Sequence, residues 1–271
     1  MGAALLDVLT QTPLETMFVL LSINTLRMLG FLYGFVPMYW GMMQSTILRV
    51  NLAIALSLPV MVANLSVVSR LVDESTPLTL ALLGPKEFAI GLGLGALASS
   101  PFAAVSYAGS IIDNFRGESD SGIPSPTGGS TQTTPLLYMV IILAVLVNLD
   151  IFAEVFSLVY SSYQIWNVND LLPAFPQITG RRVGDFLASS LRTGLLLAMP
   201  VFLLLALCEL SVIVAARLGR KMGLYDLAFM SKNLVMIITL PLIATILVMN
   251  SPDLLEKSID ALQRFLSIYD E

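Results

Sequence analysis

Long apolar runs that carry ionisable side chains are the feature of this sequence that most limits its possible folds. The 271 residues contain about six apolar runs long enough to cross a lipid bilayer. A charge at the bilayer centre costs roughly 2.5–3.5 kcal/mol on insertion scales. Ionisable residues nevertheless lie within or close to several runs: Arg27, Lys86, Glu87, Asp150, Glu154, Arg192 and Glu209. Such side chains either line a polar path or are buried against partner subunits.

The composition excludes several classes of protein. Only 12% of the residues are charged and the mean hydropathy is +0.83, whereas soluble domains hold about 25% charged residues. The net charge of −5 without a basic stripe excludes nucleic acid as a partner. The chain has no histidine and a single cysteine, Cys208, which argues against a metal site and against the usual catalytic triads. We therefore expect no cofactor and no enzymatic activity.

The apolar runs predict an all-α, multi-helix integral membrane protein. The third, fourth and fifth runs, at about 28–31 residues, exceed the roughly 20 residues that span a bilayer. Interruptions are expected at Gly84–Pro85 and Pro101 in the third, Asp150 and Glu154 in the fourth, and Pro200 in the fifth. We therefore expect long bent or broken helices and hairpins, with simple tilting as the alternative. The six runs are near Thr16–Met38, Ile47–Val68, Leu78–Ala108, Leu136–Tyr163, Phe186–Ala216 and Asn233–Met249.

The chain is expected to form one membrane-associated helical domain over residues 1–271, with two distinct segments. Residues 118–135 hold no large apolar side chain except Ile123, so we expect a flexible polar loop. Residues 251–268 begin with Ser251 and Pro252, a helix-start pattern. Their apolar side chains share one helix face, which predicts an amphipathic helix. This helix either lies on a membrane or partner, or packs on its own bundle.

Two further patterns allow more than one interpretation. Gly91 and Gly95 have the spacing of close helix packing, with a packing partner in this chain or another. Asp150 and Glu154 share a helix face. They form either a proton or cation site, or ion pairs with Arg27 or Arg192, or they face water. Of these, we favour ion pairing or exposure to water over a proton or cation site.

A longer pattern resembles the signature of the FliR/SctT family, the export-apparatus proteins of flagella and type III secretion injectisomes. The resemblance covers roughly Leu80–Leu240. The absence of the family's Pro-Gln pair after Arg220 and the polar insert at Glu118–Pro135 favour an injectisome member. The matching residues are Lys86-Glu87-Phe88, Gly91, Gly95, Pro101-Phe102, Gly109-Ser110-Ile111-Ile112-Asp113, Arg116-Gly117, Ser162-Tyr163, Pro200, Glu209, Arg217 and Lys232.

This resemblance implies a role in the bacterial inner membrane. Members of the family assemble with two small helical-hairpin proteins into a gate for unfolded secreted proteins, and the autocleaved switch subunit is a further partner. Their helices do not cross the bilayer simply, so a multi-pass chain that projects toward the periplasm is expected. A stand-alone secondary transporter using intramembrane acids is the rival hypothesis, although the sequence shows no convincing internal repeat.

The resemblance also implies a loop that plugs the channel, which maps here to about Gly109–Gly117 with the flexible polar stretch behind it. Ile111, Ile112 and Phe115 would form an apolar seal, because hydrophobic constrictions block flow by dewetting. Gly109 and Gly117 would act as hinges. Asp113 and Arg116 belong to the same motif.

Overall fold

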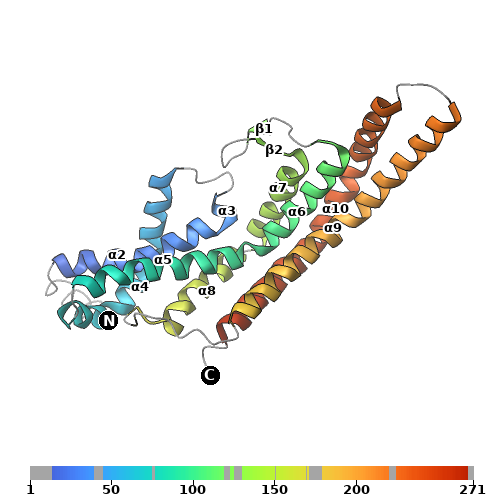
Figure 1. The fold of residues 1–271 in the computed structure, drawn as a ribbon. Coiled ribbons are helices and arrows are strands. Elements are labelled where there is room, and N and C mark those ends of the chain that lie inside the picture. The colour runs from blue at the N-terminus through green and yellow to red at the C-terminus, as the bar shows by residue number, and fades with distance from the viewer. Residues whose placement is uncertain are drawn as a thin grey trace. The chain divides into compact units, whose positions relative to one another are not determined.

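The computed structural model consists almost entirely of helices, which confirms the expected all-α class (Figure 1). It describes residues 14–39, 45–74, 77–118, 123–124, 130–149, 151–168, 170, 179–219 and 224–267. The only strands in these ranges are β1 (Ile123–Pro124) and β2 (Ser130–Thr131), which pair antiparallel. The helices are α2 (Leu14–Gly34), α3 (Val36–Tyr39), α4 (Thr46–Glu74), α5 (Pro77–Ala98), α6 (Ser100–Arg116), α7 (Thr133–Asn148), α8 (Ile151–Ile165), α9 (Thr179–Gly219) and α10 (Leu224–Ser267).

The apolar helices match the six runs expected from the sequence. Within the described residues, five helices are long and apolar enough to cross a membrane. A sixth span is possible if α7 and α8, bent by 79° at their junction, count as one. The five segments are Met17–Gly34, Thr46–Ala63, Thr79–Ala98, Val183–Arg217 and Phe229–Glu256.

The long runs are interrupted at some of the expected places and continuous at others. The third run breaks between α5 and α6, where Pro101 occupies the first turn of α6, a position that needs no backbone N–H donor. The fourth breaks between α7 and α8. At Pro85 and Pro200 the runs are not broken, because α5 and α9 continue through these prolines. A proline removes one hydrogen bond, and an apolar helix can bend without ending there.

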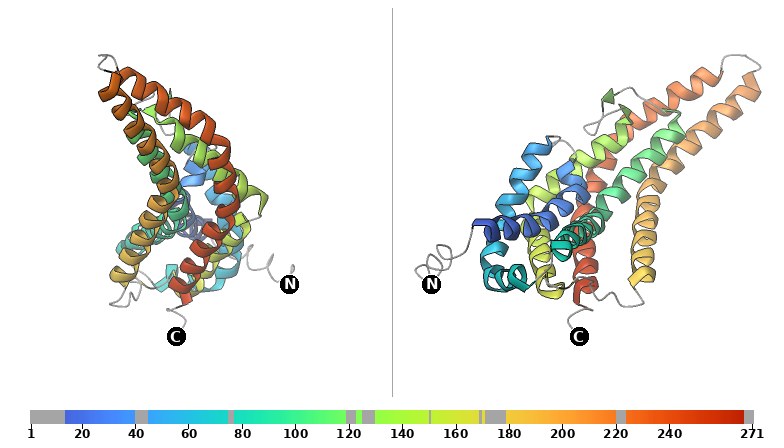
Figure 2. Two further views of the ribbon diagram at one scale, coloured as in Figure 1. Left: turned by 90° about the vertical axis from the view of Figure 1, so that its right-hand side faces the viewer. Right: turned by 60° about the vertical axis from the view of Figure 1, so that its left-hand side comes forward.

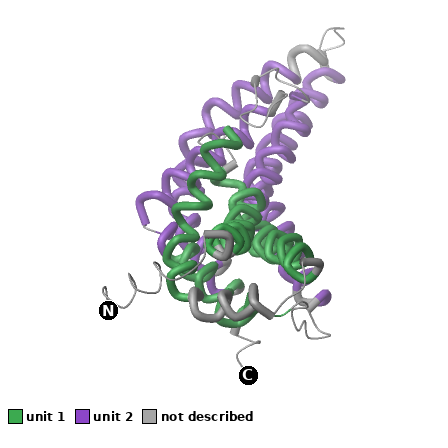
Figure 3. The backbone as a smooth tube through the Cα atoms, turned by 90° about the vertical axis from the view of Figure 1, so that its left-hand side faces the viewer, with its two compact units in different colours: residues 1–99, 154–177, 262–271 green, residues 100–153, 178–261 purple. Residues whose placement is uncertain are grey.

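The chain forms two compact units, which we describe separately (Figure 3). The first contains residues 1–99, 154–177 and 262–271, and the second contains residues 100–153 and 178–261. In the first unit, α2 packs against α4 and α5, as Figure 2 shows. Met28, Phe31 and Leu32 on α2 and Phe35 just after it are fully buried, and each such side chain contributes about 1.5–3 kcal/mol through burial.

In the second unit, α6 packs against α7 and α9. Two glycines permit these contacts. A methyl group at Gly109 would lie 2.5 Å from the backbone nitrogen of Pro135 on α7, and one at Gly194 would overlap the carbonyl oxygen of Ala104 on α6. The same unit contains α9 and most of α10, which have 41 and 44 residues.

Two segment boundaries differ from those expected. The helix expected to start at Ser251 is the end of α10, which continues through Pro252. The Ser251 hydroxyl donates to the carbonyl of Val248 at 3.1 Å instead of capping a new helix. The apolar face of this segment is buried, at Leu255, Ile259, Leu262 and Leu266. The polar segment 118–135 is shorter than expected, because α7 already begins at Thr133; residues 119–122 and 125–129 lie outside the described residues.

Candidate functional site

A buried ionic cluster lies at the centre of the first unit, and we call it the Arg27 cluster. It consists of Arg27, Lys86, Glu87, Ser162 and Tyr163, together with the backbone that follows α8. Arg27 and Glu87 have no exposed surface, and Arg27 Nε lies 2.5 Å from Glu87 Oε2. The Arg27 guanidinium carbon lies 4.1 Å from the ring centroid of Tyr163. A desolvated cation over a ring gains about 2 kcal/mol.

The two terminal nitrogens of the Arg27 guanidinium form hydrogen bonds with the end of α8 and the residue after it. Its Nη2 donates to the carbonyl of Trp166 at 2.8 Å, and its Nη1 donates to Ser162 Oγ at 3.3 Å. The Tyr163 hydroxyl in turn donates to the carbonyl of Asn24 at 2.8 Å. Arginine suits this position because it presents several donors in a fixed plane.

Lys86 completes the cluster from α5. Its Nζ lies 2.8 Å from Glu87 Oε1. It also donates to the carbonyls of Asn167, Val168 and Asp170 at 3.2, 3.1 and 2.7 Å. These three carbonyls belong to the segment that follows α8, which ends at Ile165. Two cations and one carboxylate therefore fix this segment to α2 and α5, so the burial expected against partner subunits is provided here by the chain itself.

Glycine pairs bring α2 and α5 close enough for this cluster to form. A methyl group at Gly91 would overlap the carbonyl oxygen of Arg27, and one at Gly95 would overlap that of Phe31. On the facing helix, a methyl group at Gly34 would lie 2.5 Å from the carbonyl oxygen of Leu92. The packing partner of Gly91 and Gly95 is therefore α2 of the same chain. Sequence reasoning overlooked its Gly30–Gly34 pair, although that pair has the same four-residue spacing.

A second buried cluster, the Asp113 cluster, joins α6 to α7 in the other unit. Fully buried Asp113 accepts hydrogen bonds from Thr134 N at 2.8 Å and from Thr134 Oγ1 at 2.6 Å. Arg116 Nη2 lies 3.0 Å from Asp113 Oδ1 and also pairs with Glu118. Gln132, at the N-cap of α7, makes no side-chain capping bond. Asp113 therefore caps α7 from the neighbouring helix, where a carboxylate also gains from the helix dipole.

The residues expected to form a plug loop are mostly helical. Gly109–Arg116 lie in α6, so the expected loop conformation is wrong for them. Gly109 packs against Pro135, and a hinge there would break that contact. Gly117 ends the helix with a φ of 91°. Glu118 N donates to the carbonyl of Asp113 at 2.9 Å, and this bond completes a glycine-terminated helix end.

The apolar residues of the same motif have different surroundings. Ile112 is fully buried, whereas Ile111 and Phe115 are partly exposed. The Phe115 ring lies 4.5 Å from that of Phe202, centroid to centroid. Lys232 Nζ on α10 donates to the carbonyl of Phe115 at 3.1 Å and lies 3.5 Å from Glu209 Oε2. Glu209 thus pairs with a lysine that caps the end of α6.

The remaining candidates join neither cluster. Glu154 on α8 and Arg192 on α9 are exposed, and Asp150 lies outside the described residues. The ion pair considered between Glu154 and Arg27 is not formed, since Arg27 pairs with Glu87. In the part of the chain that the structure describes, no three His, Cys, Asp or Glu side chains form a group able to hold a metal ion.

These features define a class of protein: a multi-pass helical membrane protein with buried ionic clusters that hold its helices together. Residues 18–258 match the model of the family described as bacterial export proteins, family 1, and the chain belongs to that family. This confirms the family resemblance found in the sequence and identifies a multi-pass protein of the bacterial inner membrane.

Two curated relatives resemble the chain over part of its length. The Yop proteins translocation protein T of Yersinia pestis is 28% identical over 162 residues, which cover 59% of this chain and 62% of the relative. The surface presentation of antigens protein SpaR of Salmonella typhimurium is 28% identical over 151 residues, 55% of each chain. The similarity thus spans less than two thirds of either relative.

Proposed function

We propose that this protein is a non-enzymatic subunit of a type III secretion export gate of the injectisome kind. In this proposal it assembles with the two small helical-hairpin proteins and the autocleaved switch subunit. The assembly projects toward the periplasm and passes unfolded secreted proteins. The family assignment and the names of the two relatives support this role.

The observation that carries the proposal is the length of the exposed apolar surface on α9. Its apolar segment Val183–Arg217 has 35 residues, which is about 50 Å of helix. The hydrocarbon core is only about 30 Å thick. Just 17% of an 18-residue stretch of this segment is buried within the chain. Exposed leucines recur along it at Leu191, Leu195, Leu196, Leu203, Leu204, Leu207 and Leu210.

An apolar helix of this length has two ways to avoid water. It can tilt strongly, at a cost for each ångström of mismatch, or partner proteins can cover the excess. The apolar segment Phe229–Glu256 of α10 has 28 residues, and 22% of an 18-residue stretch of it is buried. The same choice therefore applies to two helices of one unit. Partner subunits would keep the excess apolar surface of both α9 and α10 away from water. A gate built from several small membrane proteins contains such partners.

The plug of the proposed channel is the segment between Glu118 and Gln132, together with the exposed parts of Ile111 and Phe115. The base of this segment is clamped. Gln132 Nε2 donates to the Glu118 carbonyl at 3.2 Å, and Thr133 Oγ1 donates to Glu118 Oε1 at 2.8 Å. The two ends of this segment, Glu118 and Gln132, are therefore close together.

Replacing residues 119–131 with a four-residue Gly-Ser linker tests the plug. We expect an assembled complex that still secretes but leaks small ions, because the linker bridges the clamped ends without disturbing Asp113 or Thr134. The measurement is ion conductance across inner-membrane vesicles, with secretion assayed in the same strain. A strain without this protein should secrete nothing. Normal conductance in the linker variant would contradict the plug, and normal secretion in the null strain would contradict the proposed function.

A further inference from the structure

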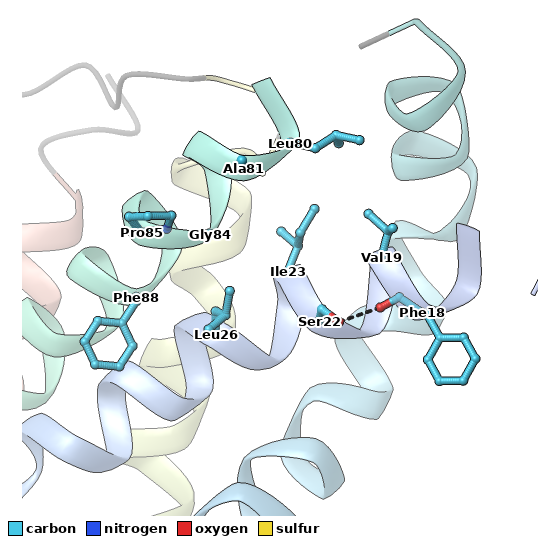
Figure 4. A pocket seen from close by; sticks show the side chains of 10 residues that line it. All are labelled: Phe18, Val19, Ser22, Ile23, Leu26, Leu80, Ala81, Gly84, Pro85 and Phe88. Carbon is cyan, nitrogen blue, oxygen red and sulfur yellow. Dashed lines mark hydrogen bonds between the residues drawn. The ribbon is translucent and has the colours of Figure 1, made fainter. Parts of the chain in front are cut away.

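An apolar groove of about 720 Å³ lies between the N-terminal halves of α2 and α5, inside the first unit. Figure 4 shows its lining side chains, which run from Phe18 to Leu26 on α2 and from Leu80 to Phe88 on α5. Ser22 contributes the only polar side chain of the lining, and its hydroxyl already donates to the carbonyl of Phe18 at 2.7 Å. The groove therefore offers its occupant burial of apolar surface and no polar side chain that is free to bind.

Glycine contacts close one end of the groove. Gly30 and Gly91 bring the backbones of α2 and α5 together just beyond Leu26 and Phe88. Ala81 and Gly84, which precede this crossing on α5 and line the groove, present little bulk toward α2. Both walls belong to segments that are apolar enough to cross a bilayer. Where these segments lie in a bilayer, the groove between them faces hydrocarbon, and its lining on α2 ends about one turn before Gly30.

We propose that this groove binds one acyl chain of a bilayer phospholipid. Its length, from Phe18 to Leu26, is about 12 Å of helix. A partner helix that crosses the bilayer needs a contact surface of about 30 Å, and the glycine crossing stops the groove well short of that. A flexible hydrocarbon chain can follow a short groove and end at its closed end. The proposal depends on the membrane location of α2 and α5 and not on the export-gate function.

The test uses a phosphatidylcholine with a diazirine in its acyl chain, incorporated into vesicles with the full-length protein. After illumination, labelled peptides are identified by mass spectrometry. We expect residues 18–26 and 80–88 to be labelled more strongly than the exposed leucines of α9, which lie outside any groove wall of this pocket. An anionic phospholipid with the same acyl chain should label equally, because no charged side chain lines the groove.

Two variants on α5 separate groove binding from general contact with lipid. Ala81→Trp fills the groove, and Ala89→Trp places the same side chain at an exposed position outside it. We expect Ala81→Trp to reduce labelling of the groove about tenfold, since losing burial of about two methylene groups weakens binding by roughly that factor. Ala89→Trp should leave the labelling unchanged.

Three results would overturn the proposal. The first is labelling of the groove no stronger than that of α9, which indicates bulk lipid only. The second is equal labelling in the two tryptophan variants. The third is the absence of groove labelling when the assembled complex is illuminated in the same vesicles, which shows that a partner subunit covers the groove instead.

Discussion

Gly91→Ala is expected to lower the free energy of unfolding by at least about 3 kcal/mol, at the upper end of the range for overpacked sites. The added methyl group would overlap the carbonyl oxygen of Arg27, which is backbone and cannot rotate away. The two helices must therefore separate, and separation also weakens the Arg27–Glu87 pair one turn away. The measurement is an unfolding titration with SDS in mild-detergent micelles, followed by circular dichroism.

Gly93→Ala is the matched control for this experiment. Gly93 lies on the same helix two residues away, and a methyl group there meets no atom within 4 Å. Alanine is a better helix former than glycine by about 1 kcal/mol, so this variant should be as stable as the parent protein or slightly more so. Equal losses of stability in the two variants would show that α2 and α5 do not pack through Gly91.

Arg27→Met should cost about 3–5 kcal/mol, the usual penalty for removing one partner of a buried ion pair. The substitution leaves Glu87 buried with Lys86 as its remaining ionic partner. It also removes the donors to Trp166 and Ser162. Arg27→Lys should recover only part of the loss, because an ammonium group cannot reproduce the planar fork. The same SDS titration measures each variant.

A double-mutant cycle isolates the pair itself. Arg27→Met combined with Glu87→Met should be more stable than Arg27→Met alone, because no uncompensated carboxylate then remains buried. Arg192→Met removes an exposed arginine from α9 and should change stability by less than about 0.5 kcal/mol. Strictly additive losses in the cycle would contradict the coupling of Arg27 and Glu87.

Hydrophobic patterning predicts the fold class and the positions of the helices. Runs of apolar residues mark transmembrane helices strongly, because the bilayer demands about 20 of them in succession. Proline and polar positions predict the breaks less well. Pro101 lies at a break between helices, whereas Pro85 and Pro200 lie within continuous helices. Whether the hydrogen bond lost at a proline ends the helix depends on the groups packed around that proline. The local sequence does not show what those groups are.

The site could be predicted only as a set of residues and not as a set of contacts. Arg27 and Glu87 were both recognisable as ionisable residues in apolar runs, yet they are sixty residues apart in the sequence. Nothing local indicates that they pair, nor that Lys86 reaches the segment after α8. Asp113 stood out in a motif, but its function as the cap of α7 depends on how α6 crosses Thr134. Tertiary packing supplies these relations.

Native mass spectrometry of the complex extracted in mild detergent tests the central claim most directly. We predict a large particle that contains this protein together with several copies of two small membrane proteins, because the apolar surfaces of α9 and α10 need protein cover. Partial disruption should release subcomplexes before the free chain. A monodisperse single chain that transports a solute in liposomes without companions would contradict the account and favour a secondary transporter.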